Sequence, residues 1–221
     1  CKDRSMHRAN HVCTVLRRIW TVGDRLGATK SNPFRNMGLR KTPSRKTLWE
    51  PDQVQALISM SDEMGVSSLG TLALLCYDLC QRPGDMRQLT WDSLKDGIFV
   101  FEQEKTKVWV DIPASPRLLK RMKKVSPRNW HDFIVYYEKT GRPYDATQYN
   151  KVFSRVRSAA GLPADLQLRD LRRTGATEMA ESGCTEDELR SVTGHQSRDI
   201  LSIYVRPTRK LAAAGINKRF G

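Results

Sequence analysis

The chain has 221 residues, and its 38 Lys and Arg against 24 Asp and Glu give a formal net charge of +14. This length is enough for one full core and a small extra piece, so stability needs no disulfide or metal. The basic residues are spread along the whole chain, which favours a polyanion such as nucleic acid as the partner.

Cysteine spacing and hydropathy restrict the class further. The five cysteines are an odd number, and Cys76 and Cys80 lie one helical turn apart in the apolar run "LALLCYDLC", which indicates core packing rather than zinc. We therefore expect a reducing, intracellular compartment. No apolar run approaches the length of a membrane span, so we expect no membrane partner. The start at Cys1 without a methionine indicates a soluble piece of a longer protein.

Residues 8–29 predict an amphipathic helix, with Gly27 as its stop. Its apolar stripe is formed by Val12, Val15, Leu16, Ile19, Val22 and Leu26. The next residues, 31–46, contain two prolines, a glycine and little that is apolar, which predicts a linker. Basic side chains on it are predicted to lie along a phosphate backbone: Arg35, Arg40, Lys41, Arg45 and Lys46.

The middle of the chain predicts two helices and then strands. Residues 47–64 favour a helix with Thr47 as a possible cap, and the nearly all-apolar residues 67–80 favour a helix buried at the centre. Residues 96–115 and 129–145 are rich in β-branched and aromatic side chains, which is typical of strands.

Helical periodicity returns in the last third of the chain, over residues 146–162, 168–183 and 184–195. The predicted stops of these helices are Gly161, Gly183 and Gly194. The sequence therefore predicts a mostly helical α+β protein with a small antiparallel sheet.

Familiar nucleotide and metal signatures are missing from the sequence. It has no Walker loop, no dinucleotide-binding glycine run, no His-Glu-x-x-His and no acidic cluster typical of a two-metal nuclease. A basic protein that acts on a phosphodiester without metal needs another source of positive charge. Arginine suits this role, because its planar fork donates two parallel hydrogen bonds to phosphate oxygens and stays charged.

Five side chains suit attack by a phenol on phosphorus: Arg82, Lys105, Arg172, His195 and Tyr204. Two guanidinium groups and an imidazole would stabilise charge, and the ammonium would protonate the departing oxygen. Asp85 lies close enough in sequence to brace Arg82. Each residue alone has an ordinary structural explanation, so the joint order and spacing carry the interpretation.

In this order and spacing the chain resembles the tyrosine recombinases of the phage integrase family. That family has an arginine after a buried helix, a β-hairpin lysine some two dozen residues later, and a His-x-x-Arg motif. A His or Trp follows, and the nucleophilic tyrosine comes nine residues after it, as Tyr204 follows His195. The resemblance covers about residues 49–206.

The resemblance implies an enzyme that cleaves and rejoins double-stranded DNA through a 3′-phosphotyrosyl link at Tyr204, with no metal and no cofactor. It implies a homo-tetramer on DNA, in the cytoplasm of a bacterial cell or a phage-infected host. It also implies three parts: residues 1–30 as the end of a helical core-binding domain, 31–46 as a basic linker, and 47–221 as the catalytic domain.

One position departs from the family pattern. Arg169 stands where the histidine of His-x-x-Arg is usual, and arginine cannot accept a proton at ordinary pH. We interpret Arg169 as a further phosphate contact on the same helix face as Arg172. Lys107 remains an alternative to Lys105. Two other functions remain open: relaxation of DNA by a type IB topoisomerase mechanism, and a DNA-binding module that has lost catalysis.

Overall fold

The computed structural model describes residues 2–39, 45–125, 132–195, 213 and 216–217 of the 221-residue chain. The chain divides into two compact units, Cys1–Lys46 and Thr47–Gly221. Among the described residues, no helix has both the length and the apolar character that a membrane crossing requires.

The first unit is the helix α1 (Lys2–Arg25) and the segment that follows it, and the predicted helix is confirmed. The segment after it is more than a linker, because Phe34 packs edge-on against Trp20 with ring centroids 5.1 Å apart. Arg17 Nε also donates to the Phe34 carbonyl oxygen at 2.9 Å. One aromatic ring thus docks the start of the segment onto the helix, and the assignment of residues 31–46 as a linker stays a prediction.

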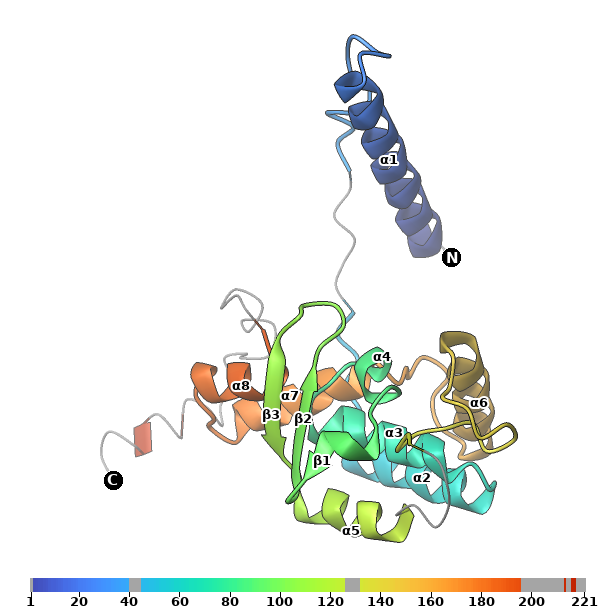
Figure 1. Ribbon diagram of the computed structural model, residues 1–221, viewed down its shortest axis with the longest axis vertical. Coiled ribbons are helices and arrows are strands. Elements are labelled where there is room, and N and C mark those ends of the chain that lie inside the picture. Colours follow the sequence, from blue (N-terminus) through green and yellow to red (C-terminus); the bar gives the residue numbers. More distant parts are fainter. Residues whose placement is uncertain (1, 40–44, 126–131, 196–212, 214–215, 218–221) are drawn as a thin grey trace. The chain divides into compact units, whose positions relative to one another are not determined.

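The second unit is mostly helical (Figure 1). Its helices are α2 (Pro51–Glu63), α3 (Ser67–Asp78), α4 (Pro83–Met86), α5 (Pro116–Val125), α6 (Ala146–Ala159), α7 (Asp170–Glu181) and α8 (Glu186–Thr193). A short 3-10 helix, η1, covers Trp91–Ser93. As predicted, α3 is buried along nearly its whole length, and it contacts α2, α5, α6 and α7. Cys76 lies within α3 and Cys80 just after it, both closed to solvent, so the prediction of core packing is confirmed.

The predicted cap of α2 was wrong. The helix begins at Pro51, and Glu50 is its N-cap in a capping box with Gln53. Proline has no backbone N–H to satisfy and its φ is already helical, so the first helical position suits it. Thr47 therefore lies before the helix. Pro83 occupies the first position of α4 for the same reason.

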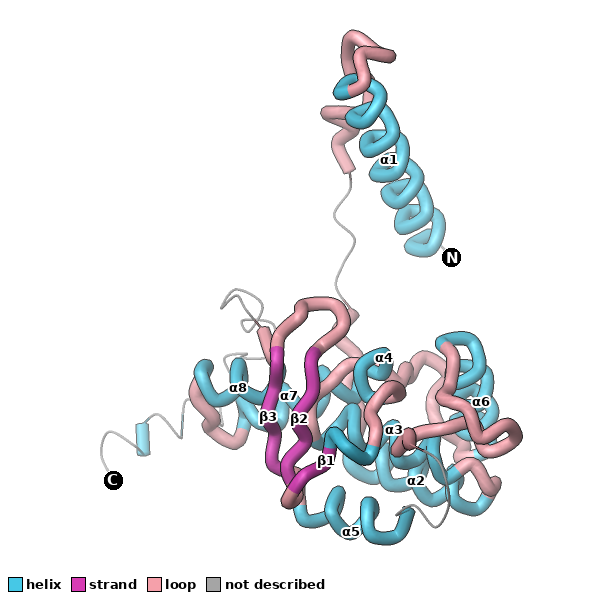
Figure 2. Tube along the Cα trace, viewed as in Figure 1, coloured by secondary structure: helices cyan, strands magenta, loops and turns pink. Residues whose placement is uncertain are grey.

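Three antiparallel strands form one sheet in the order β1 (Leu94–Lys95), β2 (Ile98–Glu102) and β3 (Trp109–Pro113) (Figure 2). Side chains on one face of the β2–β3 hairpin are buried: Phe99, Phe101, Val110 and Ile112. Phe99 pairs with Ile112 and Phe101 with Val110 across the hairpin. The richness in β-branched and aromatic residues predicted strands within 96–115, and that prediction is confirmed.

The second predicted strand pair, within 129–145, was wrong. Of these residues, 132–145 are described, and they form only isolated bridges, Thr90 to Phe133 and Tyr137 to Arg142. Ile134 and Val135 are both buried although they are consecutive. A strand would send them to opposite faces. Here β-branched residues fill the core from an irregular segment, which composition alone does not distinguish from a strand.

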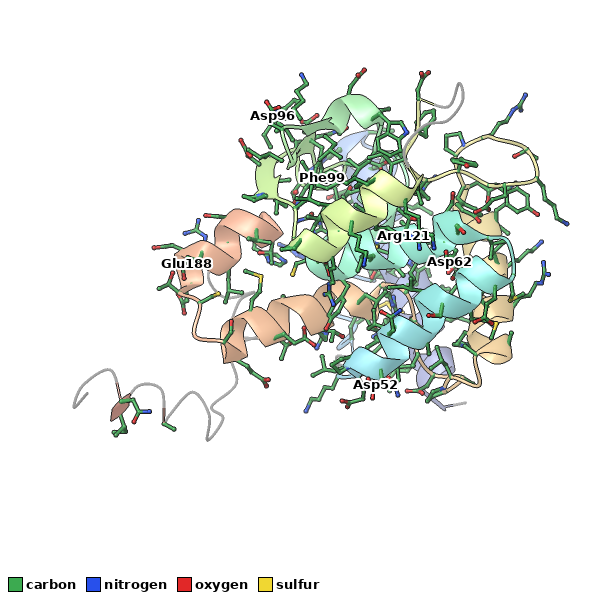
Figure 3. All side chains as sticks on the ribbon, turned by 90° about the horizontal axis from the view of Figure 1, so that it is seen from below. Asp52, Asp62, Asp96, Phe99, Arg121 and Glu188 are labelled. Atoms are coloured by element: carbon green, nitrogen blue, oxygen red, sulfur yellow. The ribbon has the colours of Figure 1, made fainter. Side chains whose placement is uncertain are left out.

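A buried ion pair joins α5 to α2, and both of its residues are labelled in Figure 3. Arg121 donates from Nη1 to Asp62 Oδ2 at 2.6 Å and from Nη2 to Asp62 Oδ1 at 2.7 Å. Burial alone would raise the pKa of Asp62, but hydrogen bonds from Arg121 and Lys124 lower it to about 2. Asp62 therefore stays ionised at ordinary pH, and its ion pair with Arg121 stays intact.

The helices α3 and α7 approach closely at Gly175. A Cβ atom there would overlap the Tyr77 carbonyl oxygen and lie 2.9 Å from Cys80 Sγ. Because α7 carries Arg172 and the chain reaches Arg82 soon after α3, this contact sets how near the two arginine-bearing elements lie.

We expect Gly175→Ala to destabilise the fold by about 3 kcal/mol, as overpacking of a rigid core does. The free energy of unfolding from urea titration checks this. Gly84→Ala is the matched control, because Gly84 is also helical and nothing lies within 4 Å of its added Cβ. A Gly175→Ala variant as stable as the control would contradict the close approach.

Candidate active site

Arg82 lies at the N-cap of α4, with its side chain 29% exposed. Its Nη1 lies 3.7 Å from Asp85 Oδ2 and donates to Gln103 Oε1 at 3.5 Å. Asp85 is itself held, because its Oδ1 accepts from the Glu104 backbone N–H at 3.0 Å. The predicted bracing of Arg82 by Asp85 is therefore present, and the side chain stays partly open to solvent.

Arg172 lies in the first turns of α7 and is only 6% exposed. Its Nη2 donates to the Thr193 carbonyl oxygen at 2.8 Å, and its Nη1 donates to Gln81 Oε1 at 3.3 Å. The same Nη2 lies 3.1 Å from His195 Nε2. Each of these three acceptors is neutral, so they fix the position of the guanidinium without offsetting its charge.

His195 follows α8, which ends at Gly194 in a left-handed conformation with φ +68°. Its Nδ1 lies 2.7 Å from Thr193 Oγ1, which donates its own hydrogen to the Leu189 carbonyl oxygen at 2.6 Å. The hydroxyl oxygen can then only accept, which assigns the proton to Nδ1 and directs the Nε2 lone pair toward Arg172. Burial, followed by the charges of Arg172 and Arg82, lowers the pKa of His195 to about 4. The imidazole is therefore neutral at pH 7.

This lowered pKa predicts a pH dependence of stability. Between the ordinary value of 6.5 and about 4, the unfolded chain binds a proton at this histidine and the folded chain does not. Folding stability is therefore lost as pH falls through that window. We expect His195→Gln to remove this part of the loss, so its unfolding free energy declines less than that of the unchanged protein between neutrality and about pH 4. Equal declines in urea titrations would contradict the lowered pKa.

Lys105 and Lys107 both lie in the turn that joins β2 to β3, and both are exposed. The turn is closed by backbone hydrogen bonds, from Gln103 N to the Val108 carbonyl oxygen and from Lys107 N to the Gln103 carbonyl oxygen, each 2.9 Å. Gln103 contacts Arg82, so this turn lies beside the arginine cluster. The choice of Lys105 over Lys107 stays a prediction.

Arg169 has surroundings different from those of Arg172. It is the exposed residue just before α7 and lines an open pocket of about 460 Å³ together with Tyr149, Phe153 and Arg157. Arg172 is instead buried among Gln81, Thr193 and His195. A shared contact of both guanidinium groups with one phosphate stays a prediction.

Several predicted residues lie outside the described part of the chain or in the other unit. Tyr204, Arg40 and Lys41 are outside the described residues. Arg35 and Lys46 are exposed in the first unit, and Arg45 is half-buried there. The structure thus brings together Arg82, Arg172 and His195 beside the turn that carries Lys105.

Three residues of the cluster were missed by sequence reasoning: Gln81, Gln103 and Thr193. All three are fully buried and polar. Gln81 stands directly before Arg82, and Thr193 stands two residues before His195. Neutral side chains carry no charge pattern, so only their position beside predicted site residues in otherwise apolar elements could have indicated them.

The chain was compared with protein families and with known protein sequences. The sequence profile of the phage integrase family matches residues 48–210. The chain therefore belongs to the phage integrase family, whose members are tyrosine recombinases, and the resemblance seen in the sequence is confirmed. No curated protein sequence matches this chain.

Solved structures share the fold at low identity. A lambda integrase dimer bound to a COC′ core site is similar with a TM-score of 0.77 and 20% identity, over 93% of this chain and 61% of that one. A lambda integrase tetramer bound to a Holliday junction gives 0.71 and 20%, over 86% and 59%. The Tn1549 transposon integrase in complex with a circular intermediate DNA gives 0.75 and 16%, over 95% and 78%. The predicted α+β fold is confirmed, and this chain spans about three fifths of the lambda integrase chains.

Proposed function

We propose that this protein is a site-specific DNA recombinase that cleaves and rejoins strands through a 3′-phosphotyrosyl intermediate at Tyr204. The observation that carries the proposal is the cluster of Arg82, Arg172 and His195, in which the buried fork of Arg172 is held by Gln81 Oε1 and the Thr193 carbonyl oxygen and lies beside the His195 imidazole. Such preorganised charge stabilises a transition state in which negative charge develops on phosphate oxygens. Family membership supports the same reaction class.

The proposed step is an in-line displacement at phosphorus. The Tyr204 oxygen forms a bond to the scissile phosphorus, the bond from phosphorus to the 5′-oxygen breaks, and the phenol proton passes to water. Lys105 gives a proton to the departing 5′-oxygen, which leaves as a hydroxyl. Rejoining is the reverse reaction with a 5′-hydroxyl of a partner strand, so the phosphodiester energy is conserved and no nucleotide is consumed.

Arg82, Arg172 and His195 play different parts in this step. The guanidinium of Arg82 and the fork of Arg172 bind the non-bridging oxygens, where a guanidinium matches two acceptors at once. The imidazole begins neutral, and a phosphate bound beside it favours its protonated form, which then donates from Nε2. The positive charge of the cluster would also stabilise negative charge that develops on the attacking phenol oxygen.

The same proposal assigns the remaining parts of the chain. Residues 1–30 would be the end of a core-binding domain, and 31–46 would be a linker along DNA through Arg35, Arg40, Lys41, Arg45 and Lys46. Residues 47–221 would be the catalytic domain. We propose a homo-tetramer on double-stranded DNA, in the cytoplasm of a bacterial cell or phage-infected host. The tetrameric lambda integrase bound to a Holliday junction supports the assembly.

A suicide substrate tests the proposal directly. A nick placed so that the cleaved strand loses a short fragment traps any phosphotyrosyl link, and the covalent adduct is counted on a denaturing gel. We expect adduct from the unchanged protein. Binding without any adduct would overturn the proposal and favour a DNA-binding module without catalysis, whereas relaxation of supercoiled DNA without strand exchange would favour the topoisomerase alternative.

Arg169 gives a further prediction in the same assay. As a phosphate contact, it should contribute at every pH, so Arg169→Ala is expected to slow cleavage by about 100-fold, as loss of one transition-state donor does. Arg169→His is expected to retain activity and to add a titration near pH ~6.5, because a group that can accept a proton is introduced. Unchanged cleavage by Arg169→Ala would remove Arg169 from the site.

A further inference from the structure

Gln103 directly follows β2, and its fully buried amide contacts Arg82 and two of the groups that hold Arg172. Its Nε2 donates to Gln81 Oε1 at 2.7 Å and to the Thr193 carbonyl oxygen at 2.9 Å. Its Oε1 accepts from Thr106 Oγ1 at 2.6 Å and from Arg82 Nη1 at 3.5 Å. One side chain therefore joins the residue before Arg82, the carbonyl that holds Arg172, and the turn that holds Lys105.

The orientation of the two amides is fixed by their surroundings. Gln81 uses its Nε2 to donate to the Leu79 carbonyl oxygen at 3.0 Å and to the Val192 carbonyl oxygen at 2.6 Å. Its Oε1 must then face Gln103 and Arg172, which both donate to it. Rotation of either amide would place two acceptors against each other, so the assignment follows from the network.

Gln103 also anchors the turn through its backbone. Its N–H and carbonyl oxygen form the two hydrogen bonds that close the turn, to Val108 and Lys107, and Thr106 binds its side chain. Lys105 lies in the middle of this turn. A displacement of Gln103 would therefore carry Lys105 with it.

The side-chain nitrogen of Gln103 packs closely against Gly194. A Cβ atom on Gly194 would lie 2.5 Å from Gln103 Nε2, so the amide rests directly on the backbone between Thr193 and His195. This glycine has φ +68° as well, so both its conformation and the space beside it exclude a side chain.

We infer that Gln103 is a positioning residue that holds the Lys105 turn in register with Arg82 and Arg172, so that the proton donor and the phosphate-binding forks meet one phosphate together. The inference rests on the proposed function. It assigns Gln103 no contact with DNA and no share in bond making. Its effect is on the placement of Lys105, for which an error of about 1 Å can cost 100-fold in rate.

A substrate with sulfur in place of the bridging 5′-oxygen isolates this effect. A thiolate with a pKa near ~8.5 leaves without a proton donor, whereas an alkoxide does not. Lys105→Ala should therefore slow cleavage of the oxygen substrate by about 100-fold or more, the usual contribution of a general acid, and cleave the sulfur substrate at nearly the normal rate.

Gln103→Leu is the main variant, because it keeps the side-chain volume and removes all four hydrogen bonds. Its fold is expected to survive, since Gln81 Oε1 and the Thr193 carbonyl oxygen both keep Arg172 as a donor. We expect cleavage of the oxygen substrate to slow by about 10- to 100-fold and the sulfur substrate to restore the rate to within about threefold. Glu102→Gln, an exposed neighbour on the same strand, is the matched control and should cleave both substrates normally.

The outcomes separate the inference from the proposed function. Equal slowing on both substrates would mean that Gln103 supports the arginines or the fold and does not position Lys105, which overturns the inference. Normal cleavage of both substrates by Gln103→Leu would also overturn it. Absence of adduct from the unchanged protein would instead defeat the proposed function, and absence of sulfur rescue in Lys105→Ala would remove Lys105 as the proton donor.

Gln103→Glu provides a second variant should the leucine variant fail to fold. One of its oxygens can still accept from Arg82 and Thr106, but the other faces two acceptors and can bridge them only as a protonated carboxyl. Of the charged and titratable groups around this position, Arg82 contacts Gln103 itself, Asp85 binds the next backbone N–H, and Arg172, beside His195, binds the same two acceptors as the amide. We expect its cleavage rate, divided by that of the unchanged protein, to rise as pH falls. A constant ratio would contradict the role of the amide donor.

Discussion

Tyr204→Phe is expected to abolish the covalent protein–DNA adduct while DNA affinity stays within about threefold, because only the nucleophilic oxygen is removed. We expect affinity to come from many basic side chains, all of which the variant keeps. Denaturing gels with a suicide substrate measure the adduct, and a mobility shift at fixed salt measures the affinity. Adduct formed by this variant would assign the nucleophile to another residue.

Other tyrosines provide the controls for this experiment. The Tyr77 hydroxyl donates to Glu178 at 2.6 Å and the Tyr144 hydroxyl donates to Glu138 at 2.9 Å. Burial, together with these carboxylates, raises the pKa of both phenols above the ordinary value, which makes them poor nucleophiles. Tyr149 lines the Arg169 pocket, so Tyr149→Phe is the matched variant and should form normal amounts of adduct.

Arg172→Ala is expected to slow cleavage by about 100- to 1,000-fold, the usual cost of removing one preorganised donor to a developing oxyanion. The fold should remain, because Gln103 still donates to both acceptors that Arg172 leaves, Gln81 Oε1 and the Thr193 carbonyl oxygen. Arg172→Lys should recover little of the rate, since an ammonium keeps the charge but loses the planar fork.

The control for Arg172 is an arginine that is held equally well but lies elsewhere. Arg117 on α5 pairs with Asp78 and lies over the Tyr77 ring at 4.7 Å from its centroid. Arg117→Ala should lower stability slightly and leave the cleavage rate of the remaining folded protein unchanged. Pre-steady-state cleavage rates compare the variants, and similar rates for Arg172→Ala and Arg117→Ala would contradict a role for Arg172 in the reaction.

Sequence patterns predicted the elements whose burial is regular. The all-apolar run became α3, which is buried on nearly all sides, and a run rich in β-branched and aromatic residues became the β2–β3 hairpin, whose side chains alternate between a buried and an exposed face. Residues 132–145 have the composition of strands without the alternation, and they fill the core from an irregular segment. Composition indicates that the residues of a segment are buried. Whether the segment forms a strand depends on backbone pairing with an adjacent strand.

The candidate site likewise contains some residues that the sequence predicted and others that it did not. Arg82, Arg172 and His195 were predicted from their order, and the fold brings them together. The amides of Gln81 and Gln103 were not predicted, because their contacts come from chain segments about 20 and 90 residues apart, which no local pattern reports. The separate surroundings of Arg169 also depend on the packing of α6 rather than on its spacing from Arg172.

Two buried thiols, Cys76 within α3 and Cys80 beside Gly175, make it possible to follow motions of this molecule chemically. Cys80 Sγ lies 3.7 Å from Met179 Sδ, and burial raises the pKa of Cys80 to about 12. Alkylating reagents attack the thiolate, so Cys76 and Cys80 react only when α3 and α7 separate and water enters. Cys13 and Cys184 are half-buried and need no such opening. The difference in alkylation rate between these two pairs of cysteines therefore measures how often α3 and α7 separate.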